Sequence, residues 1–312
     1  MKLYELTIQY VAYKQSMGMR FRTEARVLKS YCRFIGDVSI DEPQPDMVDA
    51  FLAGNGPVTR FWHRKYEVLG GFYRFATARR YIGISPLPRI VPKPPQPFVP
   101  YIFSQDELRR LLVAAESCRH PRAKMEPQTC RTLILSLYGA ALRISEALSL
   151  VLPDVDLSSG ILTIRDSKFY KTRIVPIGSD LAREMTTYRD RRLREHPAKP
   201  SAPFFVSRTG ELLTKQIAET TFRRLCVRAG VLRHDGARYQ PRLHDLRHAA
   251  AVHRVVSWYR QGADVQRLLP QLATYLGHVH IAATQRYLTM TPELLSEACL
   301  RFERYAMEGP HE

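Results

Sequence analysis

Side chains suited to holding an anionic group stand at helical spacings in the second half of the chain. Arg143 lies within an apolar run, CRTLILSLYGAALRISEALSL (130–150), where burial of a guanidinium is costly unless an anion balances its charge. Glu146, three residues later, could supply that anion in an internal salt bridge. His244 and Arg247 are also three residues apart, so on a helix they would reach one small target. The pattern therefore indicates either internal ion pairs or an anionic ligand.

A histidine and a tyrosine are separated by nine positions near the carboxyl end of the chain. They are His278 and Tyr287, in LATYLGHVHIAATQRYLTM (272–290). The ordinary expectation for a tyrosine at helical spacing is a ring packed in the core, with its hydroxyl hydrogen-bonded. A tyrosine hydroxyl can also act as a nucleophile where positive groups favour its phenolate form. The spacing by itself leaves both interpretations open for Tyr287.

Arginine, histidine, lysine and tyrosine together suit the cleavage of a phosphodiester. Two guanidiniums can grip the two non-bridging oxygens with their planar forks and lower the cost of a pentavalent transition state. A nucleophilic tyrosine then needs no metal ion. His244 and His248 are four residues apart, a spacing that can suit zinc, but no glutamate follows the first histidine and no third ligand is evident. We therefore predict phosphodiester chemistry without a metal site.

The composition indicates a folded protein whose partner is a polyanion. Of the 312 residues, 45% are hydrophobic and 25% are charged, which are values typical of globular proteins. Lysine and arginine number 47 against 30 acidic residues, which gives a formal net charge of +17. A surplus of this size favours nucleic acid as the partner, and a basic enzyme with another substrate is the alternative.

Neither the amino terminus nor any apolar run suggests export or insertion into a membrane. The residues MKLYELTIQYVAYKQ (1–15) are expected to form an amphipathic helix rather than a signal peptide. No run reaches the roughly 18 apolar residues that are needed to span a bilayer. The five cysteines are scattered without a CxxC pair, which predicts neither a zinc site nor a disulfide framework. We expect a cytoplasmic protein that is associated with the nucleoid when it binds DNA.

A proline-rich segment divides the chain. SPLPRIVPKPPQPFVP (85–100) holds seven prolines among sixteen residues, and proline favours extended backbone at its own position and at the one before it. We therefore predict two domains, at 1–88 and 104–312, that are joined by a linker at 89–103.

Four helices are predicted ahead of the linker. The first covers 1–15, and the second lies between a Thr23 cap and a Gly36 stop. The others span about 46–53 and 60–81. The last of them interleaves arginine and lysine with aromatic residues, so it either faces a nucleic-acid groove or packs an aromatic stripe in the core beneath a solvated basic face.

Beyond the linker we predict a mostly helical domain with one small sheet. Ser104 and Glu107 have the spacing of a capping box, and the apolar residues of 130–150 predict a single buried helix. Alternation of apolar and polar residues predicts a β-hairpin at 161–177, with lysines in or near its tip. Further helices are expected near 180–196, at 214–229, from about 243 and at 291–307.

These motifs together resemble those of a known enzyme family. In this order, ALRISEALSL, a lysine in the hairpin, HDLRH, LGH and a tyrosine nine residues after that histidine are similar to the motifs of the tyrosine recombinases, the phage integrase family. The resemblance covers 104–312, whereas the first 90 or so residues match the family's core-binding domain only in size, helicity and position. The interval between the HDLRH and LGH motifs is longer than is common in the family, which suggests an inserted turn around RLLPQLATY (267–275).

The resemblance implies a fold that is mainly α with a small β-sheet or hairpin. A small all-α, SAM-like core-binding domain would be followed by a mixed, mostly helical catalytic domain of the integrase type. In that domain Arg143 and Arg247 would bind the scissile phosphate, with Glu146 in support. His244 would take part in proton transfer and phosphate contact, and His278 would hydrogen-bond a phosphate oxygen.

The resemblance also implies the nucleophile and the general acid. Tyr287 would attack the phosphate, and Lys168 would protonate the 5′ oxygen that leaves, with Lys171 as the alternative. Phe169 and Tyr170 stand where the family usually has small residues around this lysine, so the choice between the two lysines stays open.

The implied activity is the cutting and rejoining of double-stranded DNA through a 3′-phosphotyrosine, without a metal, ATP or another cofactor. The family acts as a homotetramer on paired DNA sites, in some cases with accessory recombination proteins, and a terminal helix docks on the neighbouring subunit. Residues 291–307 could be that helix or could pack on their own domain. With no evident additional amino-terminal module, we expect a simple-site recombinase for integration, excision or transposition of a mobile element. The alternatives are a type IB topoisomerase and a catalytically silent DNA-binding protein.

Overall fold

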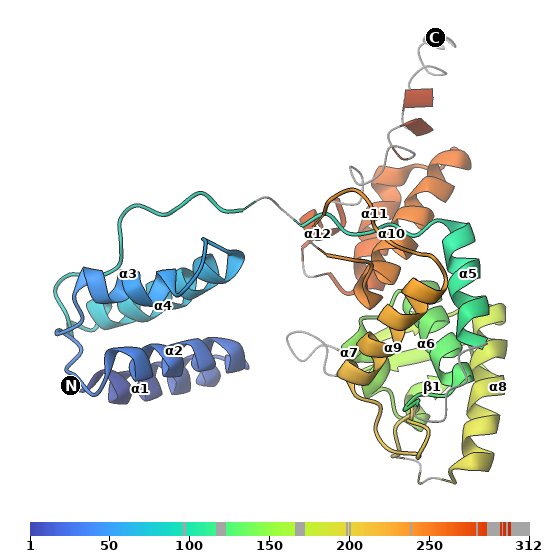
Figure 1. Cartoon of the computed structure of the whole chain (residues 1–312), viewed down its shortest axis with the longest axis horizontal. Coiled ribbons are helices and arrows are strands. Elements are labelled where there is room, and N and C mark those ends of the chain that lie inside the picture. The colour runs from blue at the N-terminus through green and yellow to red at the C-terminus, as the bar shows by residue number, and fades with distance from the viewer. Residues whose placement is uncertain are drawn as a thin grey trace. The chain divides into compact units, whose positions relative to one another are not determined.

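A computed structural model describes residues 1–95, 98–116, 123–165, 172–197, 199, 201–237, 239–278, 280–285, 294, 296–297 and 299–300. The expected residues Lys168, Lys171 and Tyr287 lie outside this described part. The chain divides into two compact units, Met1–Phe98 and Val99–Glu312, and each unit is described by itself (Figure 1).

The first unit is built from four helices, as predicted. Its α2 does not begin at a Thr23 cap, because the residue before the helix is Phe21, in the left-handed conformation with φ +45°. The Phe21 ring packs edge-on against Tyr10 at 5.5 Å between centroids, and this contact fixes the entry of the chain into the helix. The predicted stop at Gly36 is confirmed, with φ +98°. The helices are α1 (Leu3–Ser16), α2 (Arg22–Ile35), α3 (Pro45–Ala53) and α4 (Arg60–Ala78).

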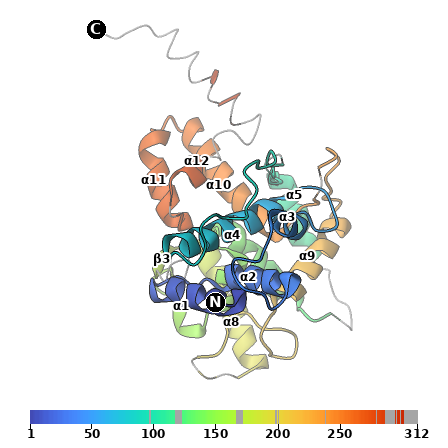
Figure 2. The same cartoon turned by 90° about the vertical axis from the view of Figure 1, so that its left-hand side faces the viewer.

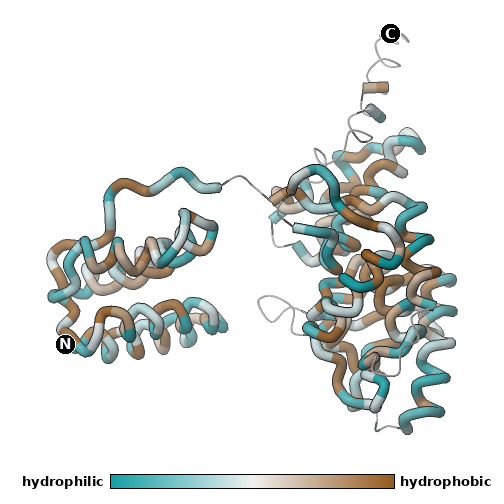
Figure 3. Tube along the Cα trace, in the orientation of Figure 1, coloured by the Kyte–Doolittle hydropathy of each residue, from teal (hydrophilic) through white to brown (hydrophobic). Residues whose placement is uncertain are grey.

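Helix α4 packs an aromatic stripe in the core of this unit. Trp62, Phe72 and Tyr73 are buried, whereas Arg60 and Arg74 are exposed. The change between hydrophobic and hydrophilic residues along the helix can be followed in Figure 3. The predicted aromatic core stripe is therefore present, and the exposed arginines lie on the solvated side of the helix.

The second unit is mostly helical and is centred on α6. This helix contacts α5, α8 and α10, and its buried Leu133 and Leu137 belong to the main core cluster. The predicted capping box is confirmed, since Ser104 N donates to Glu107 Oε2 at 2.8 Å and Glu107 N donates to Ser104 Oγ at 3.2 Å. The helices are α5 (Gln105–Glu116), α6 (Pro127–Gly139), α7 (Ile144–Ser149), the 3₁₀ helix η1 (Leu152–Asp154), α8 (Ser179–Glu195), α9 (Lys215–Arg228), α10 (Leu243–Arg260), α11 (Val265–Leu276) and α12 (Ala282–Gln285).

A three-stranded antiparallel sheet in the order β1-β2-β3 completes the second unit. Strands β2 (Ile161–Ile164) and β3 (Arg173–Pro176) form the predicted hairpin, and β1 (Val155–Asp156) pairs with β2. The two-residue β1 was not predicted because it is too short to show an alternating pattern. Arg173 pairs with Ile164. Residues 166–171, which lie between these two residues in the sequence, are outside the described part.

The prediction of one continuous helix over 130–150 is wrong. Helix α6 ends at Gly139, Ala141 has a left-handed φ of +48°, and α7 begins after Arg143, which is its extended N-cap residue. The carbonyl oxygen of Ala141 accepts a hydrogen bond of 2.6 Å from Arg247 Nη1. This long-range bond stabilises the interruption, which local sequence spacing cannot reveal.

The inserted turn expected around 267–275 is also wrong. This segment lies within α11, with Pro270 inside the helix. Leu269, Leu272 and Leu276 are buried in a cluster with residues of α10, so tertiary packing compensates for the one backbone donor that proline lacks. Helices α10, α11 and α12 lie together in Figure 2, and α11 contacts both of the others. None of the helices in the described part of the chain combines the length and the hydropathy that a membrane span requires.

Candidate active site

Three arginines from separate elements meet at the carboxyl end of α11. Arg143 Nη2 donates to the carbonyl of Gly277 at 2.9 Å, Arg173 Nε donates to that of Tyr275 at 3.3 Å, and Arg247 Nη2 donates to that of Leu276. The last carbonyls of a helix lack intrahelical donors and form the negative end of its dipole. The end of α11 therefore gathers cationic side chains that are distant in the sequence.

Gly277 ends α11 in the left-handed conformation, with φ +62° and ψ +44°. A Cβ atom at this position would come within 2.8 Å of Arg173 Nη1 and 3.0 Å of Arg173 Cζ. Both the dihedral angles and the close approach of the guanidinium require glycine. This is the physical reason for the glycine of the LGH motif.

Glu146 is the common partner of the three arginines. Its Oε1 accepts from Arg143 Nη1 at 2.5 Å and from Arg173 Nη1 at 2.8 Å, while its Oε2 accepts from Arg173 Nη2 at 2.9 Å. Arg247 Nη1 lies 3.7 Å from Glu146 Oε2. The internal salt bridge that was one of the two predicted alternatives for Arg143 therefore exists, but two further arginines share its carboxylate.

The charge of Glu146 is held in place by these contacts. Burial favours the neutral carboxyl, but hydrogen bonds from Arg173 and from the backbone of Arg143, together with the two arginine charges, outweigh it and lower the pKa of Glu146 to about 2. Glu146 is thus ionised at neutral pH. Three guanidiniums and one carboxylate leave a surplus of positive charge, which would be balanced by an anionic ligand.

The two arginines expected to bind phosphate differ in exposure. The Arg143 side chain is 28% exposed, and three of its five N–H groups have no acceptor among the described residues. Arg247 is only 1% exposed, and its guanidinium donates to the carbonyls of Ala141 and Leu276. In this conformation Arg143 can reach a ligand directly, whereas Arg247 is enclosed by the protein.

His278 follows the glycine and is partly buried. Its Nδ1 lies 2.7 Å from the hydroxyl of Thr284, a fully buried residue of α12. Desolvation and the charges of Arg247 and Arg143 lower the pKa of His278 to about 4, so the ring is neutral at pH 7. Thr284 therefore fixes the orientation of the imidazole beside the arginines.

His244 and His248 begin α10 next to the same cluster. Their rings meet edge to face at 4.7 Å between centroids. Desolvation, the neighbouring His244 and the charge of Arg247 lower the pKa of His248 to about 3. Desolvation and the charge of Arg247 also lower the pKa of His244, to about 4. Both rings are therefore neutral at pH 7.

The structure thus brings Arg143, Glu146 and Arg247 into contact, with His278 directly after Gly277, whose carbonyl binds Arg143, and with His244 three residues before Arg247 on α10. Sequence reasoning missed Arg173 and Thr284. The only signal for Arg173 was a basic residue in the second strand of the hairpin predicted at 161–177, and Thr284 had none beyond its position six residues after His278. Lys168, Lys171 and Tyr287 lie outside the described residues, and α12 ends at Gln285, two positions before Tyr287.

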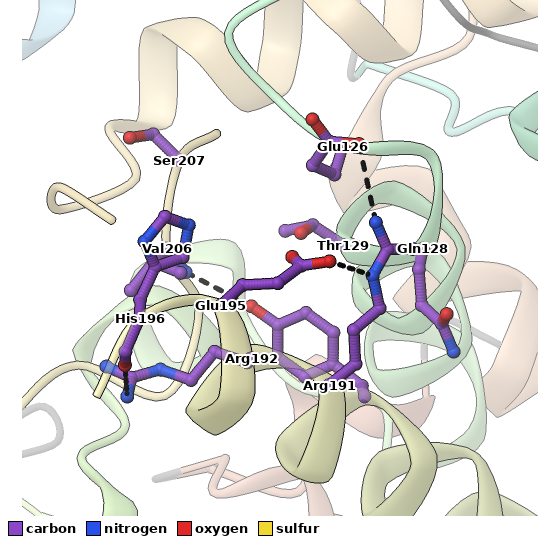
Figure 4. A pocket seen from close by; sticks show the side chains of 10 residues that line it. Glu126, Gln128, Thr129, Arg191, Arg192, Glu195, His196, Val206 and Ser207 are labelled. Carbon is purple, nitrogen blue, oxygen red and sulfur yellow. Dashed lines mark hydrogen bonds and ion pairs between the residues drawn. The ribbon is translucent and has the colours of Figure 1, made fainter. Parts of the chain in front are cut away.

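Two of the pockets in the second unit have none of the three clustered arginines among their lining residues. A cavity of about 620 Å³ is lined by Tyr138, His253 and Trp258, and also by Tyr275 and Leu276, whose carbonyls bind arginines of the cluster. A pocket of about 10 Å³, enough for about one water molecule, shares no residue with the cluster. In Figure 4 its Arg191 pairs with Glu126 and Glu195, so its charges are balanced internally.

Known proteins resemble this chain over most of its length. The phage integrase family model matches residues 102–293. A Sinorhizobium fredii protein named as an integrase/recombinase is 35% identical over 302 residues, which are 95% of each chain. The tyrosine recombinase XerC of Oceanobacillus iheyensis is 30% identical over 243 residues, which cover 76% of this chain and 72% of that protein.

Solved structures share the fold at lower sequence identity. The Tn1549 transposon integrase in complex with transposon right end DNA gives a TM-score of 0.71 at 16% identity, with coverage of 98% of this chain and 100% of that one. Together the comparisons support site-specific recombination by a tyrosine-type recombinase and favour neither the topoisomerase nor the silent accessory protein. The chain therefore belongs to the phage integrase family, the tyrosine recombinases.

Proposed function

We propose that the arginine cluster at the end of α11 holds a DNA phosphodiester for attack by Tyr287. The observation that carries this proposal is the meeting of Arg143, Arg173 and Arg247 at one carboxylate, with positive charge in excess. A phosphodiester bears one negative charge and two non-bridging oxygens, which suit the free N–H groups of Arg143. The buried Arg247 contributes its positive charge to the site. It would contact the phosphate directly once its guanidinium releases the carbonyl of Ala141 or of Leu276.

The reaction is two transesterifications in which every bond broken is replaced by a bond formed. The Tyr287 oxygen forms a bond to phosphorus while the bond from phosphorus to the 5′ oxygen breaks. The neutral imidazole of His244 takes the phenolic proton, and Lys168, or Lys171 as the alternative, gives a proton to the 5′ oxygen. A 5′ hydroxyl from a partner duplex then reverses the step and releases the tyrosine. No ATP, metal or other cofactor enters this balance.

His278 would donate a hydrogen bond to a phosphate oxygen as a neutral ring. Because its Nδ1 lies against the Thr284 hydroxyl, the hydroxyl would donate to Nδ1 and the ring proton would sit on Nε2. A neutral donor can stabilise charge that develops on the phosphate without a change of protonation state.

The first unit would form the core-binding domain, with residues 1–88 as its extent, a linker at 89–103 and the catalytic domain at 104–312. The exposed Arg60 and Arg74 of α4 support contact with the DNA backbone, which depends on such cationic side chains. Assembly would be a homotetramer on paired DNA sites of a mobile element, with accessory recombination proteins as further partners, in the cytoplasm and on the nucleoid.

The terminal segment bears on this assembly. Leu294 is 1% exposed in a cluster with α10 and α11, and Glu297 pairs with Arg260 at 2.9 Å. These two residues pack on their own unit. Of the two alternatives for residues 291–307, their contacts favour packing on the same domain for the beginning of the segment. We place the contact with a neighbouring subunit beyond Glu297, where Cys299 and Leu300 are exposed.

One selection distinguishes the proposed function from its alternatives. Nicked duplexes of random sequence are incubated with the protein without metal or ATP, and covalently bound DNA is recovered after denaturation and sequenced. Covalent capture of a defined sequence supports a site-specific recombinase. Relaxation of any supercoiled plasmid would instead indicate a topoisomerase, and binding without a covalent adduct would indicate an accessory protein.

A further inference from the structure

Arg173 makes a two-point side-chain contact with Glu146, although no motif of the sequence pointed to it. Two of its nitrogens donate in parallel to the two carboxylate oxygens, at 2.8 and 2.9 Å, and its Nε donates to the carbonyl of Tyr275. The side chain is 12% exposed, against 28% for Arg143. Arg173 is therefore enclosed by protein groups, whereas Arg143 is open to a ligand.

The bidentate pair determines how Arg143 can meet the same carboxylate. Arg143 gives Glu146 a single side-chain N–H, from Nη1, and gives Gly277 another, from Nη2. A carboxylate favours a planar, two-point pair with a guanidinium. If Arg173 did not occupy that position, Arg143 could rotate into it and would then present fewer N–H groups to a ligand.

Arg173 also connects two parts of the site. It begins β3, directly after the segment that carries Lys168 and Lys171 in the sequence, and its guanidinium packs against Gly277, the residue before His278. Displacement of this side chain would loosen the end of α11 as well as Glu146. Arg173 thus contacts Glu146 and lies close to Gly277, which are the two residues that bind the Arg143 guanidinium.

We propose that Arg173 is a positioning residue, which holds Glu146 and the end of α11 so that Arg143 keeps its outward N–H groups for the scissile phosphate. The proposal rests on the proposed function, because it concerns the phosphate that this function places at Arg143. Arg173 itself does not touch the substrate.

The test compares two versions of the duplex that the wild-type chain captures. One carries the natural phosphodiester at the cleavage position, and the other carries a methylphosphonate, which lacks the negative charge that a guanidinium balances. Arg173→Ala should lower the single-turnover rate of cleavage of the phosphodiester by about 30-fold, within the roughly 100-fold range of small misplacements in an active site. On the methylphosphonate the loss should be under about 3-fold, as for Arg143→Ala. Equal losses on both duplexes would overturn the proposal.

A double variant, a conservative variant and a control variant separate positioning from a general loss of structure. In a Glu146→Gln background, Arg173→Ala should cost less than about 3-fold, because Arg173 acts through Glu146. Arg173→Lys keeps the charge without the fork, so its rate should fall between those of the wild type and Arg173→Ala. Arg183→Ala, which removes an exposed arginine paired with Asp180, is the matched control and should leave both rates unchanged. If Arg173→Ala lowered the cleavage rate in the Glu146→Gln background as much as it does in the wild-type background, the proposal would be contradicted.

A measurement without DNA keeps the two proposals distinguishable. If the wild-type chain captures no duplex, the proposed function fails, and inorganic phosphate then serves as the probe. Its affinity is obtained from the increase of Tm with phosphate concentration. Arg173→Ala and Arg173→Lys should weaken this affinity at least about 5-fold, and Arg183→Ala should not change it. Equal affinity in wild type and both Arg173 variants would show that Arg173 does not position the anion-binding group.

Discussion

Arg143 and Gly277, 134 positions apart in the sequence, are joined by a hydrogen bond of 2.9 Å from the guanidinium to the backbone carbonyl. The bond connects the N-cap of α7 to the end of α11 and shows that the ALRISEALSL and LGH motifs are in direct contact. Because Arg173 and Arg247 bind the two preceding carbonyls, the end of this helix sets the position of the whole cationic group.

Gly277→Ala should destabilise the protein by about 1–3 kcal/mol, because the left-handed backbone is unfavourable for alanine and its Cβ would displace the Arg173 guanidinium. Urea unfolding measures the change. Gly178→Ala is the control, since nothing lies within 4 Å of a Cβ there and its φ is −71°. A midpoint for Gly277→Ala equal to that of the control would contradict the assigned role of the glycine.

Glu146→Gln should destabilise the protein by about 3 kcal/mol at pH 7, because a buried carboxylate shared by arginines is lost. The pKa of Glu146 is lowered to about 2 in the folded state, from an ordinary value of 4.5. Its stabilising contribution is therefore complete above about pH 4.5 and is lost as the pH falls toward 2. Unfolding free energies of both proteins at several pH values should converge in this range.

The control for that comparison is Asp180→Asn, which removes one partner of an exposed ion pair and should have no measurable effect. A constant difference between wild type and Glu146→Gln from pH 7 to pH 3 would show that the carboxylate charge is not what stabilises the cluster.

Thr284→Val should lower the single-turnover cleavage rate by about 10-fold, because the hydroxyl that orients His278 is removed while the side-chain shape is kept. Thr284→Ser retains the hydroxyl and should stay close to the wild-type rate. Quenched-flow or manual time courses of adduct formation give both rates. If valine and serine had the same effect, packing rather than the hydrogen bond would account for Thr284.

The choice between Lys168 and Lys171 can be made with a substrate whose leaving group needs no proton. A 5′-bridging phosphorothiolate departs as a thiolate, so the loss of the general acid no longer matters. Lys168→Ala should cleave natural DNA at least about 100-fold more slowly and should regain most of that rate on the phosphorothiolate. Lys171→Ala should show little effect on either duplex. The reverse pattern would assign the general acid to Lys171.

Features set by neighbouring residues could be predicted from the sequence. The Ser104–Glu107 capping box, the stop at Gly36 and the hairpin that ends in β3 depend on local hydrogen bonds or alternation. The grouping of His244 and Arg247 at the start of α10 likewise follows from helical spacing.

Features that depend on distant contacts could not be predicted from the residues alone. The interruption between α6 and α7 depends on the bond from Arg247 to Ala141, across 106 positions. The contact of Arg173 with Glu146 depends on how β3 packs beside α7 and α11. The joint placement of Arg143, His244, Arg247 and His278 was expected from a resemblance to the family and not from spacing, because no local pattern connects these segments.

The central claim is that the phenol at position 287 becomes esterified to DNA at the arginine cluster. Mass spectrometry of the digested covalent complex tests this most directly. Wild type, Tyr287→Phe and Arg143→Ala are compared at concentrations that bind equal amounts of DNA. The account predicts a nucleotide-modified peptide that contains Tyr287 in the wild type, none in Tyr287→Phe, and a strongly reduced amount in Arg143→Ala. A modified residue elsewhere, or an adduct that persists in Tyr287→Phe, would contradict it.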